Sequence, residues 1–245
     1  MRAAGLTLLA AAMLGGAAAR AEEPKAALPK AEIEKIVREY LMREPEIIYE
    51  AIQELQQRRV VAEAERQEKA VQANKAQLFA TAGDPIIGNP KGDVTLVQFF
   101  DYRCGYCRSM VPGLRNLIGK DKGLRMVMKE FPVLGPDSVV AARAALAAEK
   151  QGRFTDFHLA LMGPKELDAV AIKGVASRLG LDVDRLVADM NSESVERALQ
   201  ANAQLAGELG ITGTPSFVIG GKLIPGAVEI AQLESLITAQ RQTTN

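Results

Sequence analysis

Apolar residues in the segment 22–80 recur at the three- and four-residue spacing of amphipathic helices. One series precedes Pro45 and another follows it: Ile33, Ile36, Val37, Tyr40 and Leu41, then Ile47, Ile48, Ala51, Ile52 and Leu55. A segment this short cannot build a core of its own. We therefore expect residues 22–55 to pack on the main domain or, in preference, on copies of themselves as an oligomerisation element. Residues 56–77 carry mainly charges and Ala, which predicts a solvated helix or helical linker.

From residue 81 onwards the pattern is that of an α/β domain. Residues 81–90 are rich in Gly, Pro and Asp and predict a loop. Short apolar runs predict strands at residues 94–100, 124–131, 216–220 and 222–225. Gly220–Gly221, between the last two, is typical of a tight hairpin. Helical spacing predicts helices at residues 106–118, over the Ala-rich block 136–209 with glycine breaks, and at 229–240.

The first 21 residues have the pattern of a secretory signal. A basic start at Met1 and Arg2 leads into an apolar stretch over residues 3–14, and Ala19–Arg20–Ala21 fits a small-x-small cleavage site. This stretch is short for a bilayer, which takes about 20 apolar residues. We expect export to the periplasm with cleavage after Ala21, which would place the cysteines in an oxidising compartment.

Composition and charge exclude several classes of protein. The 30 basic and 30 acidic residues balance, and no basic stripe is interleaved with aromatic residues, so nothing favours binding to nucleic acid. Two Cys and a single His cannot complete a Cys-rich zinc site within one chain. We therefore expect neither a resident metal nor another cofactor.

The two cysteines form a Cys104–Gly105–Tyr106–Cys107 dithiol between a predicted strand and a predicted helix. A disulfide across so small a loop removes little unfolded-state entropy, so the pair is a poor staple and we interpret it as reactive. At a helix N-terminus, Cys104 faces unpaired N–H groups and the positive end of the helix dipole. Both favour the thiolate and lower the thiol pKa from about 8.5. Cys104 is the predicted nucleophile, and the more buried Cys107 would resolve the mixed disulfide.

Arg103 and Arg108 flank this pair and could either stabilise the thiolate or be plain solvated charges. His158 lies among apolar residues of the helical block, and we interpret it as a packing residue.

In combination, several segments resemble the DsbA-like thiol–disulfide oxidoreductases. They are residues 99–107 with the dithiol, Glu-Phe-Pro-Val-Leu-Gly at 130–135, Phe-Thr-Asp-Phe-His at 154–158 and Gly-Thr-Pro-Ser-Phe at 213–217. The resemblance covers about residues 84–240. It implies a thioredoxin-like fold over residues 81–245 with an inserted helical domain at about 136–209.

Within that family the chain is most similar to the suppressor-of-copper-sensitivity C proteins, which carry a trimerising N-terminal helical extension. This similarity implies a helical stalk over residues 22–80 and favours a homotrimer, although the apolar stripes are too short to set trimer against dimer. It also implies protein substrates with disulfides or thiols, and a membrane protein that resets the dithiol.

The resemblance also assigns substrate-binding positions. Thr214–Pro215 would be a cis peptide beside the cysteines, leaving the Thr214 backbone free to pair with an extended substrate segment. An ordinary trans turn is the alternative. Gly105 and Tyr106 would belong to the same surface.

One position departs from the family pattern. Many relatives carry a buried carboxylate on the strand before the cysteines, as a proton acceptor for the inner thiol. The matching residue here is Gln98, which cannot take a proton. Asp101 or Glu130 could substitute, or the role could be absent.

The leading hypothesis is a periplasmic thiol–disulfide oxidoreductase. Several dithiols on one oligomer could hold a misfolded chain at several points, which favours a disulfide isomerase over a DsbA-like oxidase. The net direction depends on redox poise, which the residues do not determine. Two nearby thiolates are also a soft-ligand pair for Cu(I), so a copper-tolerance binding protein is an alternative. A holdase chaperone with incidental cysteines ranks last.

Overall fold

The computed structural model describes residues 28–79, 83–163 and 167–244 of the 245-residue chain. The chain divides into two compact units, Met1–Gln56 and Gln57–Asn245. The expected signal at residues 1–21 lies outside the described residues and stays a prediction. No described helix is both long and apolar enough to cross a membrane.

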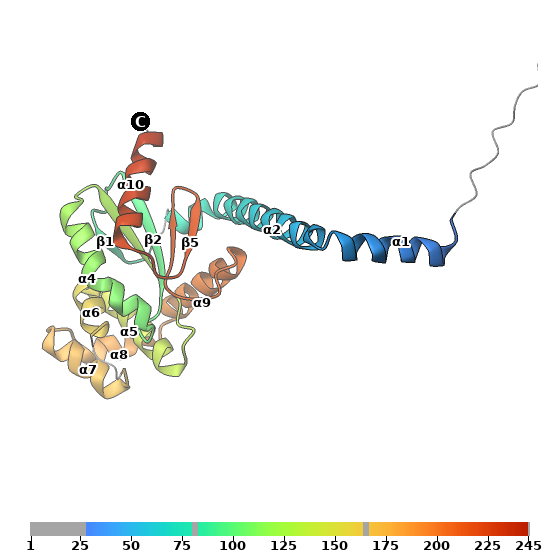
Figure 1. The fold of residues 1–245 in the computed structure, drawn as a ribbon. Helices are drawn as coiled ribbons and strands as arrows, with labels where there is room; N and C mark the ends of the chain where they lie inside the picture. Colours follow the sequence, from blue (N-terminus) through green and yellow to red (C-terminus); the bar gives the residue numbers. More distant parts are fainter. Residues whose placement is uncertain (1–27, 80–82, 164–166, 245) are drawn as a thin grey trace, which may run out of the picture. The chain divides into compact units, whose positions relative to one another are not determined.

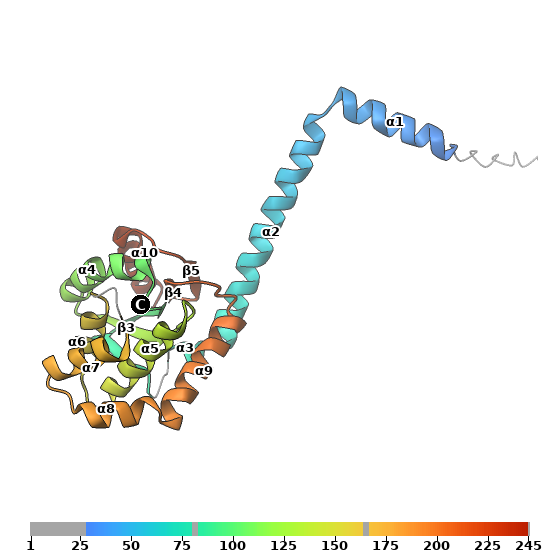
Figure 2. The same ribbon diagram turned by 90° about the horizontal axis from the view of Figure 1, so that it is seen from below.

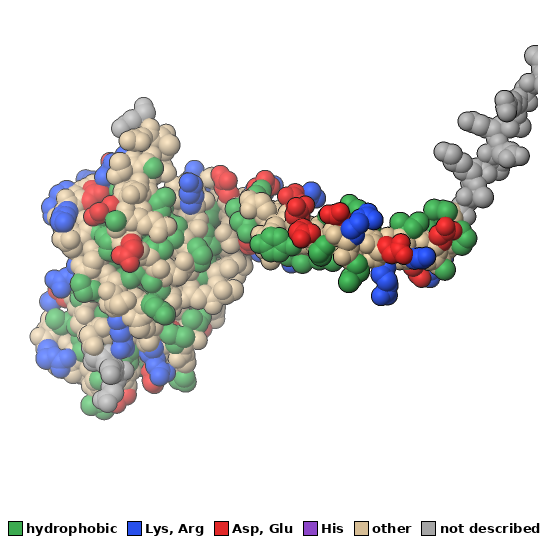
Figure 3. All heavy atoms as spheres, in the orientation of Figure 1, with side chains coloured by type: hydrophobic (Ala, Val, Ile, Leu, Met, Phe, Trp, Pro, Cys, Tyr) green, Lys and Arg blue, Asp and Glu red, His purple; other side chains and the backbone are tan. Residues whose placement is uncertain are grey.

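The first unit contains α1 (Lys30–Arg43) and the start of α2 (Glu46–Ala73), with the break at Pro45. Pro45 disfavours helical conformation at the residue before it, which ends α1 there. Residues of both predicted stripes are on the surface, 44–50% exposed: Ile33, Ile36, Val37, Tyr40, Ile48, Ile52 and Leu55. Apolar side chains are visible along both helices in Figure 3. Exposed apolar surface of this extent is typical of an interaction site. Self-association through these residues stays a prediction.

The second unit is built on a five-stranded sheet of order β1-β3-β2-β4-β5 (Figure 1). Its strands are β1 (Ile86–Gly88), β2 (Val94–Phe100), β3 (Leu124–Glu130), β4 (Ser216–Ile219) and β5 (Lys222–Pro225). The central strands β2 and β3 are parallel and are connected by α4 (Gly105–Lys120), while the other pairs are antiparallel. The predicted strands are confirmed to within a residue at their ends.

The loop prediction for residues 81–90 is wrong at its centre, where β1 pairs antiparallel with β3. A strand of three residues is too short for an alternating pattern to reveal it. Gly88 indicates a loop in the sequence, but here a glycine is required because the backbone of β3 lies very close to it. It has a φ of +90°, and a Cβ at this position would lie 2.6 Å from the Leu124 carbonyl oxygen.

The two faces of the sheet carry separate cores. Leu96 and Phe100 of β2 share one core with α4 and α10 (Ile230–Thr244), whereas Val97 and Phe99 share the other with α3 (Lys75–Phe79) and α9 (Glu193–Glu208). The side chains of β2 alternate between the faces, as the pleat of a strand requires. The face shared with α4 is the one that carries Gln98 and the cysteines.

The predicted linker over residues 56–77 is correct for most of α2 but wrong at its end. Val71 is 1% exposed, and Leu78 of α3 is fully buried in the second core. The second compact unit therefore begins at Gln57 and not at residue 81. Isolated apolar residues in a charged stretch predict a solvated helix. Here they are buried instead, because the helix packs on an apolar face of the sheet.

The block 136–209 is helical, as predicted. It comprises α5 (Pro136–Glu149), α6 (Phe154–Leu161), α7 (Ala169–Arg178), α8 (Val183–Met190) and α9, with α5 to α8 gathered in one cluster (Figures 1 and 2). Ala141, Ala144, Ala145 and Ala148 of α5 are fully buried, so small side chains let its neighbours approach closely. This cluster brings α6 next to the cysteine-bearing end of α4.

Candidate active site

Cys104 is the N-cap residue of α4. Its backbone is extended while the next residue begins the helix, so its sulfur lies over the free N–H groups of the first turn. Cys104 Sγ accepts a hydrogen bond from the Cys107 N–H at 3.2 Å. Both sulfurs are largely enclosed, with Cys104 5% exposed and Cys107 fully buried. The predicted helix after the strand is thus confirmed, and it begins at Gly105, one residue before the predicted start at Tyr106.

The Thr214–Pro215 peptide is cis, as predicted. Although 110 positions away in sequence, the Thr214 carbonyl oxygen accepts a hydrogen bond from the Cys104 thiol at 3.2 Å. The Gly226 N–H donates to the Pro215 carbonyl and holds this loop against the following hairpin. Within the described part of the chain, the Thr214 N–H donates to no acceptor. A strand-like donor is therefore available directly beside the sulfur.

The two thiols have opposite proton affinities. The pKa of Cys104 is lowered to about 6, chiefly by the hydrogen bond from Cys107 and also by Thr214 and by backbone N–H groups, against the effect of burial. The pKa of Cys107 is raised, first by its hydrogen bond to Cys104 and then by burial. At neutral pH the reduced pair therefore holds a thiolate at Cys104 and a thiol at Cys107.

We expect the ultraviolet thiolate absorbance of the reduced protein to titrate with a midpoint near the Cys104 pKa of about 6. The transition should be missing in Cys104→Ser. Because the folded pKa is lowered from 9.0, reduced wild type should lose stability relative to Cys104→Ser as pH falls from about 9 to about 6. A midpoint close to that of an unperturbed thiol would contradict the assignment of Cys104 as the activated sulfur.

Asp101 organises the loop that precedes the dithiol. Its carboxylate accepts hydrogen bonds from the backbone N–H groups of Arg103, Val133 and Leu134 and from the Ser138 hydroxyl, at 2.7–2.9 Å. All of these are charge-assisted hydrogen bonds in a buried position. Asp101 therefore joins the cysteine loop to the loop before α5, and its oxygens are fully engaged.

The flanking arginines bond to backbone carbonyls. Arg108 Nε donates to the Tyr102 carbonyl at 2.7 Å, and Arg103 Nη1 donates to the Leu134 carbonyl at 3.1 Å. Arg103 also lies 3.7 Å from Asp137. Of the two interpretations left open, these contacts favour a structural role over direct thiolate stabilisation.

Between the cysteines, Gly105 is exposed and Tyr106 is 70% exposed. A large aromatic side chain that is left in solvent next to a reactive sulfur can contact a bound polypeptide. Both residues are exposed next to the dithiol, and their role in substrate binding stays a prediction.

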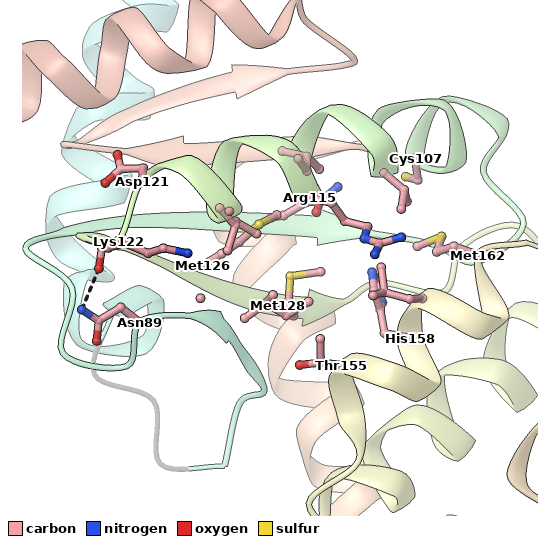
Figure 4. A pocket seen from close by; sticks show the side chains of 18 residues that line it. Asn89, Cys107, Arg115, Asp121, Lys122, Met126, Met128, Thr155, His158 and Met162 are labelled. Carbon is pink, nitrogen blue, oxygen red and sulfur yellow. Dashed lines mark hydrogen bonds between the residues drawn. The ribbon is translucent and has the colours of Figure 1, made fainter. Parts of the chain in front are cut away.

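Behind Cys107 lies a cavity of about 490 Å³ between α4, the sheet and α6 (Figure 4). Its lining is mainly apolar and includes Gln98, Met126 and Met128, together with Cys107 and His158. Gln98 thus lines the same cavity as the inner cysteine. Among the described residues no cluster of three or more His, Cys, Asp or Glu side chains could hold a metal ion.

His158 packs between aromatic rings, as predicted, with the Phe154 ring stacked at 5.4 Å and the Phe100 ring edge-on at 4.9 Å. It also takes part in a polar contact that we did not predict. Tyr102 Oη lies 3.1 Å from His158 Nδ1 and donates to Glu130 Oε1 at 3.0 Å. Burial lowers the pKa of His158 to about 3, so the imidazole is neutral. We did not predict a role for Tyr102 from the sequence. Its position two residues before Cys104 is the signal that could have identified it as a residue near the site.

A dithiol at a helix N-terminus, next to a cis-proline loop on a mixed sheet of this order, defines a thioredoxin-like protein of thiol–disulfide exchange. Residues 95–238 match the DSBA-like thioredoxin domain, and residues 30–60 match the N-terminal domain of the copper resistance protein ScsC. The chain belongs to the DsbA-like thioredoxin family and carries an ScsC-type N-terminal domain.

Solved structures agree with this assignment. A thioredoxin-like oxidoreductase from Silicibacter pomeroyi is 42% identical with a TM-score of 0.67, over 69% of this chain and 98% of that one. A linker-deletion mutant of Proteus mirabilis ScsC is 30% identical with a TM-score of 0.68, over 90% of this chain and 100% of that one. The Na⁺/H⁺ antiporter NhaA 1 of Salinispora arenicola is 31% identical over 159 residues, but the chain spans only 24% of its length.

Proposed function

We propose that this protein is an exported, periplasmic thiol–disulfide oxidoreductase that isomerises protein disulfides as a homotrimer. The observation that carries the chemistry is Cys104 Sγ at the N-cap of α4, within 3.2 Å of the Thr214 carbonyl. The Cys104 thiolate attacks a substrate disulfide, so a new S–S bond forms while the substrate S–S bond breaks and one substrate sulfur leaves as a thiolate. A different substrate thiolate then attacks the substrate sulfur of the mixed disulfide and releases Cys104 as a thiolate, which leaves the substrate with a rearranged disulfide. Alternatively, Cys107 attacks Cys104 Sγ, which forms the Cys104–Cys107 disulfide and releases the substrate thiolate.

The cis-proline loop is the proposed contact for the substrate backbone. The Thr214 N–H has no acceptor among the described residues, and the Thr214 carbonyl has no thiol donor once Cys104 is a thiolate or has joined the substrate. One donor and one acceptor then face an extended segment, which is how strand addition binds with little demand on sequence. The exposed Tyr106 side chain would contact the same substrate.

The N-terminal unit supports self-association, on which the proposed isomerase direction depends. Ile33, Val37 and Tyr40 in α1, and Ile48, Ile52 and Leu55 in α2, repeat at alternating four- and three-residue spacing and are exposed. This is the seam spacing of helices that associate. Several dithiols on one assembly raise the effective concentration of thiolate around a bound misfolded chain. A membrane partner protein that keeps the dithiol reduced completes the proposal.

We expect Ile48→Gln with Ile52→Gln to convert the assembly to monomers in sedimentation experiments, because each change places a polar group in the proposed seam. Refolding of a scrambled-disulfide substrate should fall about tenfold as effective concentration is lost, while attack by Cys104 on a small disulfide changes less than about twofold. The matched control, Gln53→Ala with Gln56→Ala, should leave both unchanged. Monomers that refold the substrate at the wild-type rate would contradict the isomerase argument.

One observation favours the oxidase alternative. A thiolate stabilised at a pKa of about 6 makes the reduced form more stable, which makes the disulfide form more oxidising. Equilibration of the pair against a glutathione series separates the two: a strongly oxidising potential without refolding of scrambled substrate indicates a disulfide donor. Tight stoichiometric Cu(I) binding without turnover of disulfides would instead indicate the copper-binding alternative.

A further inference from the structure

We infer that His158, Tyr102 and Glu130 form a buried proton relay that takes the proton from Cys107 when Cys107 attacks the mixed disulfide. The inference deepens the proposed exchange reaction and rests on it. It is drawn from the cavity behind Cys107, the two hydrogen bonds of Tyr102 and the contrast between two buried carboxylates.

The resolving step needs a base at the inner cysteine. The hydrogen bond with Cys104, and then burial, raise the pKa of Cys107, and Cys107 is buried at the end of the cavity. The cavity that Cys107 lines is bordered by residues of β1, β2, β3, α4 and α6. Gln98 of β2 has no basic atom, and the ionisable side chains lining the cavity are Cys107, Arg115, Asp121, Lys122 and His158. Asp121 is paired with Arg241, so His158 is the lining side chain that offers a neutral basic nitrogen.

His158 presents that nitrogen to the cavity. Its Nδ1 is hydrogen-bonded to the Tyr102 hydroxyl, and its Nε2 has no hydrogen-bond partner in the described part of the chain. Figure 4 shows the His158 side chain entering the cavity from α6 and Cys107 entering from α4, with Arg115 also reaching in. A volume of about 490 Å³ holds water that can bridge polar atoms. Arg115 has no hydrogen-bond or ion-pair partner among the described residues and would face a thiolate formed at Cys107.

The positions of three heavy atoms accommodate two proton arrangements. With Glu130 ionised, the Tyr102 hydroxyl donates to Glu130 Oε1 and accepts from His158 Nδ1–H, which leaves Nε2 unprotonated. With Glu130 protonated, Glu130 donates to Tyr102, Tyr102 donates to Nδ1, and the proton of His158 sits on Nε2. The same 3.0 Å and 3.1 Å contacts serve both arrangements, so protons move without a movement of side chains.

The proton transfer balances as follows. The Cys107 S–H bond breaks, the sulfur keeps the electron pair, and the proton passes through a cavity water to His158 Nε2. The proton on Nδ1 moves to Tyr102 Oη, and the Tyr102 proton moves to Glu130 Oε1. Total charge is unchanged, because a negative charge leaves Glu130 and appears on Cys107. The imidazole exchanges one neutral tautomer for the other and never becomes a cation in its buried position.

Glu130 is suited to be the final acceptor, and Asp101 is not. Asp101 accepts four hydrogen bonds, whereas Glu130 Oε2 is buried without any partner in the described chain. Burial, and to a lesser degree the charge of Asp101, raise the pKa of Glu130 well above its usual range, against the hydrogen bond from Tyr102. A carboxylate of ordinary pKa would be too weak a base for a buried thiol, and efficient transfer needs matched affinities.

The test follows the reaction of the reduced full-length protein with dithiobis-nitrobenzoate, which releases one coloured thiolate per step. The first, second-order phase is attack by Cys104, and the second, first-order phase is attack by Cys107. Tyr102→Phe and Glu130→Gln should each slow the second phase about 10- to 100-fold and leave the first within about twofold. Thr155→Val, which removes another polar group that lines the cavity, should change neither phase.

The pH profile distinguishes a relay from a merely structural role. In Tyr102→Phe the second phase should rise about tenfold per pH unit, because solvent hydroxide becomes the base, whereas wild type should vary much less. The relay would be overturned if Tyr102→Phe or Glu130→Gln kept a normal first phase and also showed the wild-type rate and pH profile in the second phase. The absence of a solvent deuterium effect on the second phase of the wild type, a measurement that depends on no variant, would also overturn it. Loss of the first phase in wild type would instead contradict the proposed function itself.

Discussion

Cys104→Ser should lower the rate of disulfide exchange at neutral pH by about 1,000-fold or more. The wild-type sulfur has a pKa of about 6 and is mostly thiolate there, whereas a serine hydroxyl in the same place stays protonated and is a poor nucleophile toward sulfur. The measurement is single-turnover reaction with a model disulfide, followed by the release of its thiol. Retention of more than about a tenth of the activity would show that Cys104 is not the attacking group.

Cys107→Ser is the matched control because it removes the resolving thiol and leaves the nucleophile. The variant should still attack and should then accumulate a mixed disulfide at Cys104, visible as a mass increase equal to the substrate thiol. The Cys107 thiol hydrogen bond is the largest cause of the lowered Cys104 pKa, so the pKa of Cys104 should rise in this variant. Trapped adduct at Cys107 in Cys104→Ser would reverse the two assignments.

The second large effect is on stability. Asp101→Ala should lower the free energy of unfolding by about 3–5 kcal/mol, measured by urea denaturation. The substitution leaves the buried Ser138 hydroxyl and the N–H groups of Arg103, Val133 and Leu134 without their acceptor. The same loss would loosen the loop that sets the direction of Cys104, so the Cys104 pKa should move back toward its usual value.

Asp137→Ala provides the comparison. Its carboxylate is about half exposed and lies 3.7 Å from Arg103, so its removal should change the free energy of unfolding by less than about 0.5 kcal/mol. Equal effects of Asp101→Ala and Asp137→Ala would show that charge near the loop matters, and not the four hydrogen bonds of the buried group.

The two buried carboxylates around the dithiol thus divide their roles. Asp101 is held in place by donors and supports the architecture of the loop. Glu130 keeps one oxygen free and is linked to the cavity through Tyr102 and His158. Either residue could be assigned to proton transfer from position along the chain. The hydrogen bonds that each carboxylate accepts, and the link from Glu130 to the cavity, separate them.

Local signals in the sequence determined much of the second unit. Alternating or continuous apolar runs predicted β2 to β5. Gly220–Gly221 predicted the hairpin between β4 and β5, and both glycines have the positive φ that such a turn requires. The place of Cys104 at a helix N-terminus, on which its predicted reactivity rests, also followed from the sequence, because it lies between a buried strand and a helix. These features depend on neighbours within a few residues.

Contacts between distant segments were decided by the tertiary structure alone. Nothing in the local pattern shows that Tyr102 meets His158 and Glu130, that Val71 completes a core under the sheet, or that residues 86–88 form an edge strand. Periodicity reports which side of an element is buried but not what covers it. Pairing partners are chosen by packing over the whole sheet, so the proton acceptor for Cys107 could be inferred only after α6 had been placed against β2 and α4.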